Sequence, residues 1–322
     1  MTLHAKIAFK LHLDAHAKVF EKLGNPAFSK TCGRWFPPPH TDMKSFDCMS
    51  VSNSARGGVF FLSFDWEDWF QLCCPPFDGP GALDAYPSRL GLATDLALEF
   101  CESLKAKATW FCLADQAARN KGLVMRIADY GHSIGLHGHT HKRAFDLSQK
   151  AFLQETTKAK AFMEDILGRP ILGFRAPEWS LRGPAEHYWE YLAEMGFKFD
   201  SSRAPVIGLG SIKWGRRPYL LANDLWEMPP LAFGPTPMWS WPFRTAPEPI
   251  LRLALKKAAM RPGGVLVLHP WELDEVQPRL QGATLAHRFA HGAGIKGYRE
   301  RLQRLFSGFE LCPLESFFME TA

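Results

Sequence analysis

The chain has 322 residues, of which 46% are apolar and 22% charged, a composition typical of a globular protein with one large core. Its net charge of +5 comes from 38 basic and 33 acidic residues without a long lysine and arginine block, which argues against nucleic acid as a partner. No stretch approaches the roughly 20 apolar residues that span a bilayer, and the first residues lack a signal-peptide pattern. We therefore expect a cytoplasmic protein without a transmembrane segment.

Residues 1–57 differ in character from the rest of the chain. Pro37-Pro38-Pro39 and scattered serines interrupt them, and they show no strand–helix order. We predict an irregular or disordered N-terminal extension. Met43 and Met49 are alternative starts, so translation of residues 1–48 is an open question.

The seven cysteines are an odd number without regular spacing in a chain too long to need disulfide staples. This usage favours a reducing compartment. Vicinal cysteines rarely share a metal or a relaxed disulfide, so we interpret Cys73-Cys74 as buried or idle thiols.

After residue 58, short apolar runs alternate with helical patterns. Strands are predicted at 59–65, 107–113, 132–137, 171–176, 197–201 and 265–269, with a weaker one near 309–314. Helices are predicted near 91–104, 115–130, 148–167, 184–195, 247–260 and 296–306. This order predicts an α/β fold of parallel strands with helical crossovers. No glycine-rich phosphate loop follows a strand, so we favour a barrel over a doubly wound nucleotide-binding sheet.

Four polar segments each follow a predicted strand. They are Asp65-Trp66-Glu67-Asp68, His137-Gly138-His139-Thr140-His141, Arg175-Ala176-Pro177 and His269-Pro270-Trp271-Glu272. The carboxyl ends of successive parallel strands meet on one face of an α/β fold. We therefore expect these segments to form one pocket.

His137 and His141 stand four residues apart, a spacing that can place two imidazoles on one side of a helical turn as neutral metal ligands. Three carboxylates are candidates for the third ligand: Asp65, Glu67 and Asp68. A shell of two histidines and one carboxylate leaves positions for water and a substrate carbonyl, and a remaining carboxylate can act as the base. Zinc suits this shell best, with cobalt, nickel, manganese and iron as alternatives. We expect His139 to point elsewhere.

His269 ends an apolar strand, where an unpartnered imidazole is costly. Amide cleavage needs a second histidine outside the metal shell, because the leaving nitrogen must be protonated. A structural core histidine is the alternative. Arg175 needs a buried partner, and Asp65 is a natural one. Asp200 ends another predicted strand and is expected to orient Arg175 or His269.

Together these segments resemble the polysaccharide deacetylases of carbohydrate esterase family 4, the NodB-homology domain. The residues similar to its five motifs are, in order, Phe64-Asp65-Trp66-Glu67, His137 to His141, Phe174-Arg175-Ala176-Pro177, Asp200-Ser201-Ser202 and Leu268-His269. The resemblance runs from about residue 58 to the end. It implies an α/β fold of the distorted (β/α)7 barrel type, with an irregular N-terminal and a C-terminal extension.

The resemblance implies these roles: Asp65 as general base, His137 and His141 as metal ligands, Arg175 as the residue that tunes the base, and His269 as general acid. Most of the family has adjacent aspartates in the first motif, whereas Trp66 fills the second place here. In the branch with allantoinase-like and peptidoglycan-deacetylase-like enzymes, the metal carboxylate falls two positions after the base. That spacing fits Glu67, with Asp68 as the alternative.

The segment Leu268 to Asp274, followed by Gln277-Pro278-Arg279, is similar to a branch found with bacterial exopolysaccharide and exosortase loci. That branch carries its own C-terminal extension. We accordingly predict a catalytic domain over residues 58–322, with a branch-specific part over about 205–322. The branch usually has an Arg-His-Tyr triplet where this chain has Ala290-His291-Gly292, so His291 receives no role.

Aromatic residues near the motifs are the candidate sugar contacts. They are Trp239 and Trp241 as a stacking platform, with Trp179, Trp271 and Pro177 beside the motifs. Core burial is the alternative for each. The expected reaction removes N-acetyl groups from amino sugars of a bacterial surface polysaccharide or its lipid-linked precursor. The alternatives are an allantoinase-like hydrolase of small linear or cyclic amides and a non-catalytic glycan-binding relative. The sequence does not set the oligomeric state.

Overall fold

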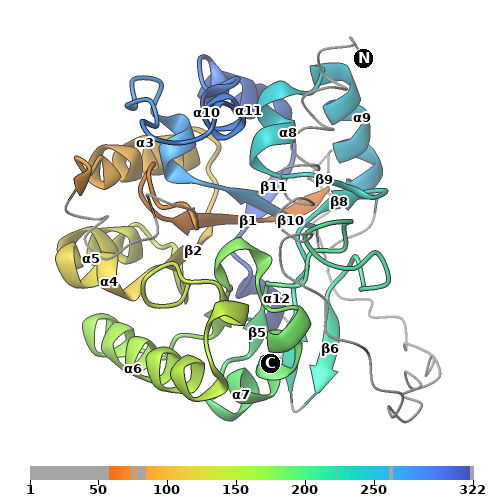
Figure 1. Cartoon of the computed structure of the whole chain (residues 1–322). Coiled ribbons are helices and arrows are strands. Elements are labelled where there is room, and N and C mark those ends of the chain that lie inside the picture. The colour runs from red at the N-terminus through yellow and green to blue at the C-terminus, as the bar shows by residue number, and fades with distance from the viewer. Residues whose placement is uncertain (1–57, 74–76, 78–84, 223, 261–263, 320–322) are drawn as a thin grey trace.

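The computed structural model describes residues 58–73, 77, 85–222, 224–260 and 264–319. A nine-stranded sheet forms its centre, in the order β10-β1-β2-β3-β4-β5-β7-β6, with β11 also paired to β1 (Figure 1). Neighbouring strands are parallel except β6 and β7. The strands are β1 (Val59–Trp66), β2 (Thr109–Cys112), β3 (Ser133–Leu136), β4 (Gly173–Phe174), β5 (Phe199–Asp200), β6 (Tyr219–Ala222), β7 (Leu225–Glu227), β10 (Gly264–Leu268) and β11 (Glu310–Cys312).

The sheet curls until its two sides approach each other. Pro230, just after β7, forms a parallel bridge with Val265 of β10, and the Leu231 amide donates to the Val265 carbonyl at 2.8 Å. This contact joins the chain beyond β7 to the opposite end of the parallel strand order. The expected α/β fold with a distorted, NodB-like barrel is therefore confirmed.

Helices surround the curled sheet (Figure 1). They are α3 (Leu90–Ser103), α4 (Ala114–Arg119), α5 (Lys121–Asp129), α6 (Gln149–Leu167), α7 (Trp189–Glu194), α8 (Ser240–Thr245), α9 (Glu248–Ala259), α10 (Leu285–Gly292), α11 (Tyr298–Phe306) and α12 (Ser316–Met319). The described residues also form four short 3-10 helices: η1 (Ala144–Asp146), η2 (Pro177–Trp179), η3 (Gly183–Tyr188) and η4 (Pro270–Leu273). A separate hairpin pairs β8 (Ala232–Phe233) with β9 (Thr236–Pro237).

Helix α6 shows how local sequence sets an element. Ser148 caps its start by accepting a hydrogen bond from the Ala151 amide at 3.3 Å, and Gly168 ends it at φ 63°. One face is buried in the core, through Phe152, Thr156, Ala159 and Met163. Gly131 and Gly196 also adopt the expected positive φ, whereas Gly263 lies outside the described residues.

All seven predicted strands are present, most of them shorter than expected. The predicted helix 115–130 is two helices that meet at Asn120. Strands β6 to β9 and helices α8, α10 and α12 were not predicted, because all of them are short. The predicted extension at residues 1–57 lies outside the described residues.

The alternation of side chains along β1 explains where the site forms. Phe60, Leu62, Phe64 and Trp66 pack into the large cluster beneath the helices, whereas Phe61 packs into a second cluster with residues of β2, β5 and β10. Successive side chains of a strand point to opposite faces. Ser63 and Asp65 therefore share the face of Phe61, which is the inside of the barrel.

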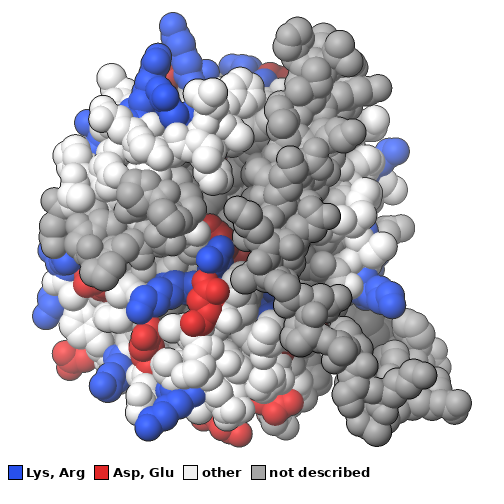
Figure 2. All heavy atoms as spheres, viewed as in Figure 1, with Lys and Arg blue, Asp and Glu red and all other residues white. Residues whose placement is uncertain are grey.

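None of the helices within the described ranges is long and apolar enough to cross a bilayer. Figure 2 shows lysine and arginine side chains lying among aspartate and glutamate side chains at the centre of the visible face.

Candidate active site and metal centre

The inside of the barrel changes from apolar to polar along its strands. Phe111, Phe199 and Val267 belong to the apolar cluster of the interior. Beyond them, at the carboxyl ends of the strands, lie Asp65 and Arg175, which form a buried ion pair. The strand ends thus bring together residues 110 positions apart in the sequence.

Glu67, His137 and His141 form a cluster that could hold a metal ion. One ligand atom from each lies within 4.8 Å of the others. Oε2 of Glu67 is 2.7 Å from Nε2 of His141 and 3.8 Å from Nε2 of His137. Ligand atoms of a tetrahedral zinc site, each about 2.0–2.2 Å from the metal, lie roughly 3.3 Å apart. The three residues therefore fit a divalent metal in both type and spacing.

The backbone around the histidines fixes their orientation. His137 follows β3, and its Nδ1 lies 2.9 Å from the carbonyl oxygen of Arg175. Donation from Nδ1–H to this carbonyl leaves the Nε2 lone pair for a metal, as at other histidine metal sites. Gly138 and His141 have φ of 82° and 60°, so the loop turns sharply enough to return His141 to the cluster. His139 is exposed, as expected.

Arg175 is held on several sides. Its Nη1 donates to Oδ1 of Asp65 at 2.6 Å and to Oγ of Ser63 at 2.9 Å. Its Nε and Nη2 donate to the carbonyl and the hydroxyl of Ser201 at 3.1 and 2.8 Å, and its guanidinium lies over the Phe111 ring. Because all three guanidinium nitrogens donate hydrogen bonds and the group also packs on a ring, Arg175 holds Asp65 in one place.

Burial raises the pKa of Asp65, but the Arg175 guanidinium and nearby histidines outweigh burial and leave the pKa below its usual value. The same balance, dominated by His141, lowers the pKa of Glu67. Burial lowers the pKa of His137 to about 4. Asp65 is therefore ionised and His137 neutral, the states that a base and a metal ligand require.

Asp68, the alternative metal ligand, faces another way. Its Oδ1 accepts hydrogen bonds from the backbone amides of Trp69 and Arg89, both at 3.1 Å. Asp68 thereby tethers the chain just before α3 and is absent from the cluster of candidate ligands among the described residues. Glu67 is the carboxylate of this cluster.

His269 follows β10, which lies on the other side of β1 from the strands that carry His137 and Arg175. Its Nε2 lies 3.9 Å from Asp65 and 3.6 Å from Glu67. Its Nδ1 lies 3.2 Å from Oε2 of Glu272 and 2.8 Å from Oγ of Ser240. Burial lowers the pKa of His269, but Glu272 and the other carboxylates outweigh burial and raise it to about 9. His269 therefore carries a proton at neutral pH.

The expectation that Asp200 orients Arg175 or His269 is wrong. Phe199 points into the barrel, so Asp200, the next residue of β5, points to the outer face. Its carboxyl accepts a hydrogen bond from Ser202 at 2.5 Å and interacts with Glu227 of β7. Ser201 takes the place next to Arg175 that Asp200 was expected to fill.

The aromatic candidates differ in their surroundings. Trp179 and Trp239 pack together with ring centroids 5.0 Å apart, and both are largely buried. Trp271 packs against the His269 ring and its indole nitrogen lies 3.5 Å from Glu67. Trp241 is half-buried. Trp271 thus borders the cluster directly, whereas Trp179 and Trp239 lie beside it through Arg175 and Ser240.

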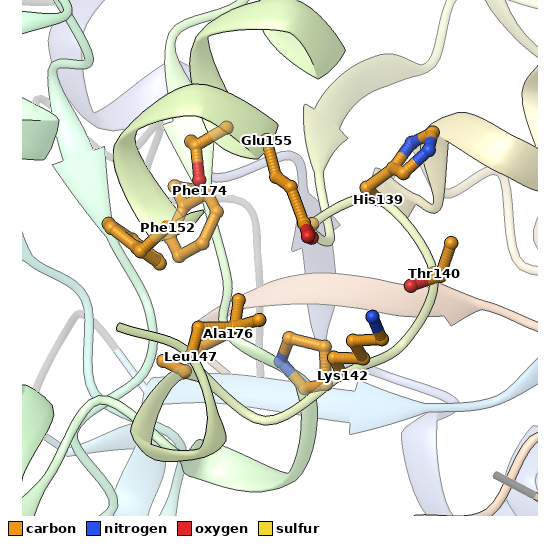
Figure 3. A pocket seen from close by; sticks show the side chains of 12 residues that line it. His139, Thr140, Lys142, Leu147, Phe152, Glu155, Phe174 and Ala176 are labelled. Atoms are coloured by element: carbon orange, nitrogen blue, oxygen red, sulfur yellow. The ribbon is translucent and has the colours of Figure 1, made fainter. Parts of the chain in front are cut away.

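Pro177 lines a small pocket behind the histidine loop, shown in Figure 3. His139, Thr140 and Lys142 stand on one side of this pocket, and Phe152 and Glu155 of α6 lie opposite. None of the three candidate metal ligands lines it. The pocket is therefore separate from the metal cluster.

The sequence analysis missed several residues that contact the proposed machinery, among them Ser63, Cys73, Ser240 and Arg244. Ser63 could have been found from its alternation with Asp65. Cys73, interpreted as a buried or idle thiol, is buried, but it also lies 3.4 Å from Nδ1 of His141 and donates to the carbonyl oxygen of His141. No local pattern marks Ser240 and Arg244, since only the fold brings them to His269 and Glu272.

Comparisons with known proteins show which families parts of the chain match. Residues 83–199 match the family described as polysaccharide deacetylase, and residues 201–319 match a domain of unknown function, DUF3473. A peptidoglycan deacetylase of Helicobacter pylori is 27% identical over 127 residues, 38% of this chain and 42% of that protein. A peptidoglycan-N-acetylglucosamine deacetylase of Bacillus cereus is 32% identical over 84 residues, 26% of this chain and 39% of that protein. The chain thus spans less than half the length of these relatives.

The fold also has a solved counterpart. A crystal structure from Mycobacterium smegmatis assigned to the polysaccharide deacetylases aligns with a TM-score of 0.57 at 18% identity. The alignment covers 82% of this chain and 90% of that one, which shows a shared fold. The chain therefore contains a polysaccharide deacetylase domain of the NodB type, carbohydrate esterase family 4, and joins it to DUF3473.

Proposed function

We propose that the protein is a metal-dependent hydrolase that removes N-acetyl groups from amino sugars of a bacterial surface polysaccharide or its precursor. The observation that carries this proposal is the convergence of three groups. They are the Glu67, His137 and His141 cluster, the Asp65–Arg175 pair and the protonated His269. Amide hydrolysis needs a metal position, a base and an acid, and these groups supply them within 4.0 Å of one another.

The residues divide the proton transfers between them. Asp65, ionised beside Arg175, takes a proton from the attacking water as its oxygen bonds to the acetyl carbon. His269 gives its Nε2 proton to the sugar nitrogen as the carbon–nitrogen bond breaks. Acetate and a free amine leave, and the proton on Asp65 returns through solvent to neutral His269.

A divalent metal at Glu67, His137 and His141 would act as a Lewis acid on the acetyl oxygen and the water. The donor set of two imidazoles and a carboxylate suits zinc best, with cobalt, nickel, manganese or iron as alternatives. Trp271 beside His269, and Trp179 with Trp239, are the proposed sugar-contacting surfaces. We place the reaction in the cytoplasm, where the lipid-linked precursor is the available substrate.

Acetate release tests this proposal. The zinc-loaded protein is incubated with N-acetylglucosamine oligomers, other N-acetylated amino sugars and a matched panel of ureides and cyclic imides. We expect acetate from at least one N-acetylated sugar, and its loss after chelation with recovery on adding zinc. Turnover of ureides or imides alone would replace the proposal with small-amide hydrolysis. Binding of the sugars without any turnover would indicate a glycan-binding relative.

A further inference from the structure

Glu272 occupies an unusual position for an acidic residue. It is fully buried, three residues after His269, and its Oε2 accepts a hydrogen bond from the His269 amide at 3.1 Å. This bond caps η4, which begins at Pro270. A cap would account for the backbone contact alone. Two further contacts of Glu272 are not needed for capping.

The first additional contact is with the imidazole. Oε2 of Glu272 lies 3.2 Å from Nδ1 of His269. An ionised carboxylate only accepts hydrogen bonds, so Nδ1 must carry the hydrogen in this contact. That arrangement fixes the ring with Nε2 facing Asp65 and Glu67, the direction from which a substrate nitrogen would be protonated.

The second contact is a buried ion pair. Oε1 of Glu272 lies 3.0 Å from Nε of Arg244 on α8. Arg244 is itself fixed from behind, because its Nη1 and Nη2 donate to the carbonyl oxygens of Ala290, His291 and Ala293 at 3.0, 2.7 and 3.1 Å respectively. These carbonyls lie at the carboxyl end of α10, where a cation is favourable.

The end of α10 is anchored in turn to the base side of the site. The His291 ring stacks on Trp271 with centroids 4.5 Å apart and planes 5° apart. Its Nε2 lies 2.7 Å from the carbonyl oxygen of Trp69, close to Asp68 in sequence. His291 received no role from the sequence. It connects the end of α10, which binds Arg244, to the chain that follows β1.

We propose that Glu272 is the positioning residue of His269, and that Arg244 and the carboxyl end of α10 hold Glu272 for this task. The inference rests on the proposed deacetylase function. It gives the region matched by DUF3473 a chemical role, since His269, Glu272 and Arg244 all lie within it. In the reaction, the Nε2 proton of His269 moves to the leaving nitrogen, while Nδ1–H stays bonded to Glu272.

The Glu272→Gln variant tests the inference, because it removes the charge and keeps the volume. A general acid contributes about 10²- to 10⁴-fold, and loss of its orienting partner should remove part of this, about 10- to 100-fold in kcat for an N-acetylated sugar. An aryl acetate loses its phenolate without protonation, so its hydrolysis should change less than about twofold. Equal losses on amide and ester would mean a structural role and overturn the inference.

Three controls sharpen the result. Glu275→Gln makes the same chemical change three residues later at an exposed position and should retain wild-type rates. Glu272→Asp keeps the charge and should recover part of the amide activity. In a His269→Gln background, Glu272→Gln should cause no further loss, because Glu272 acts through His269. Additional loss in that background would contradict the inference.

A spectroscopic measurement keeps the inference testable if Glu272→Gln folds poorly or if no amide is turned over. In protein labelled with ¹⁵N-histidine, the Nδ1–H signal of His269, assigned by its loss in His269→Gln, should lie downfield in the wild type. Glu272→Asp should retain a downfield signal. A wild-type signal at the position of free imidazole would overturn the inference. A wild type without amide turnover would instead count against the proposed function.

Discussion

The base side and the acid side of the site are built in different ways. Asp65, His137 and Arg175 lie at or next to the ends of neighbouring strands and are fixed by the barrel itself. His269 also ends a strand, but Glu272, Arg244 and Ser240 hold it from short elements outside the sheet. The regular geometry of the sheet positions the residues of the base side, whereas the acid side depends on irregular segments folding correctly around His269.

The largest expected effect on activity comes from the metal cluster on the base side. His137→Ala should abolish zinc binding and lower kcat/KM at least about 10³-fold, since a Lewis acid lowers the barrier by several kcal/mol. His139→Ala, an exposed histidine of the same loop, is the matched control. Metal analysis by mass spectrometry and acetate release check both. Full zinc content and activity in His137→Ala would contradict the assignment.

Asp65→Asn should separate the base from the metal. The variant should keep zinc, because Asp65 is outside the cluster of candidate ligands, and should lose about 10²- to 10⁴-fold in kcat. Asp129→Asn makes the same change at an exposed position of α5. Comparable zinc content and a near-wild-type kcat in Asp65→Asn would remove Asp65 from the mechanism.

The protonation of His269, on the acid side, should determine how kcat/KM depends on pH. The pKa of His269 is raised to about 9, chiefly by Glu272 against the effect of burial, with Glu67 and Asp65 adding to the increase. The protonated acid is present below this value, so kcat/KM should fall as pH rises through about 9. Glu272→Gln should move this fall to lower pH. An unchanged alkaline limit in that variant would show that Glu272 does not act on His269.

The smallest effect is expected on the outer face of the sheet, where Asp200 and Glu227 are buried together. Burial raises the pKa of Asp200 to about 6, and burial together with the charge of Asp200 raises the pKa of Glu227 well above its usual value. The folded state therefore holds protons that the unfolded state has lost, and the free energy of unfolding should fall as pH rises from about 4 through 6.

Glu227→Gln should make this fall shallower by about 1–3 kcal/mol over that range. Glu194→Gln, at an exposed position of α7, should leave the pH dependence unchanged. Urea unfolding at several pH values measures the difference. A Glu227→Gln curve parallel to the wild type would mean that the pair does not share this proton.

The contrast between the two sides also explains what the sequence could predict. Asp65, His137 and Arg175 follow apolar strands with clear patterns, so their convergence could be predicted from the rule for parallel strand ends. Asp200 follows a strand too, but it points outward. A two-residue strand such as β5 gives too little alternation to show which face its last side chain takes.

The partners of His269 could not be predicted for a different reason. Glu272 is three residues away and visible in the motif. Arg244 lies 28 residues before Glu272, and the carbonyls of Ala290, His291 and Ala293 lie 18 to 21 residues after it. Their contacts arise only when α8 and α10 pack. Likewise, the choice between Glu67 and Asp68 depended on the turn after β1, where Asp68 binds two backbone amides.

The central claim is that Asp65 and His269, one from each side, act on the same amide bond. Acetate release by the zinc-loaded wild type, Asp65→Asn and His269→Gln, measured on an N-acetylated sugar at equal zinc content, tests it most directly. We predict that each variant loses at least about 10²-fold in kcat. Full turnover by zinc-loaded His269→Gln or Asp65→Asn would contradict the account.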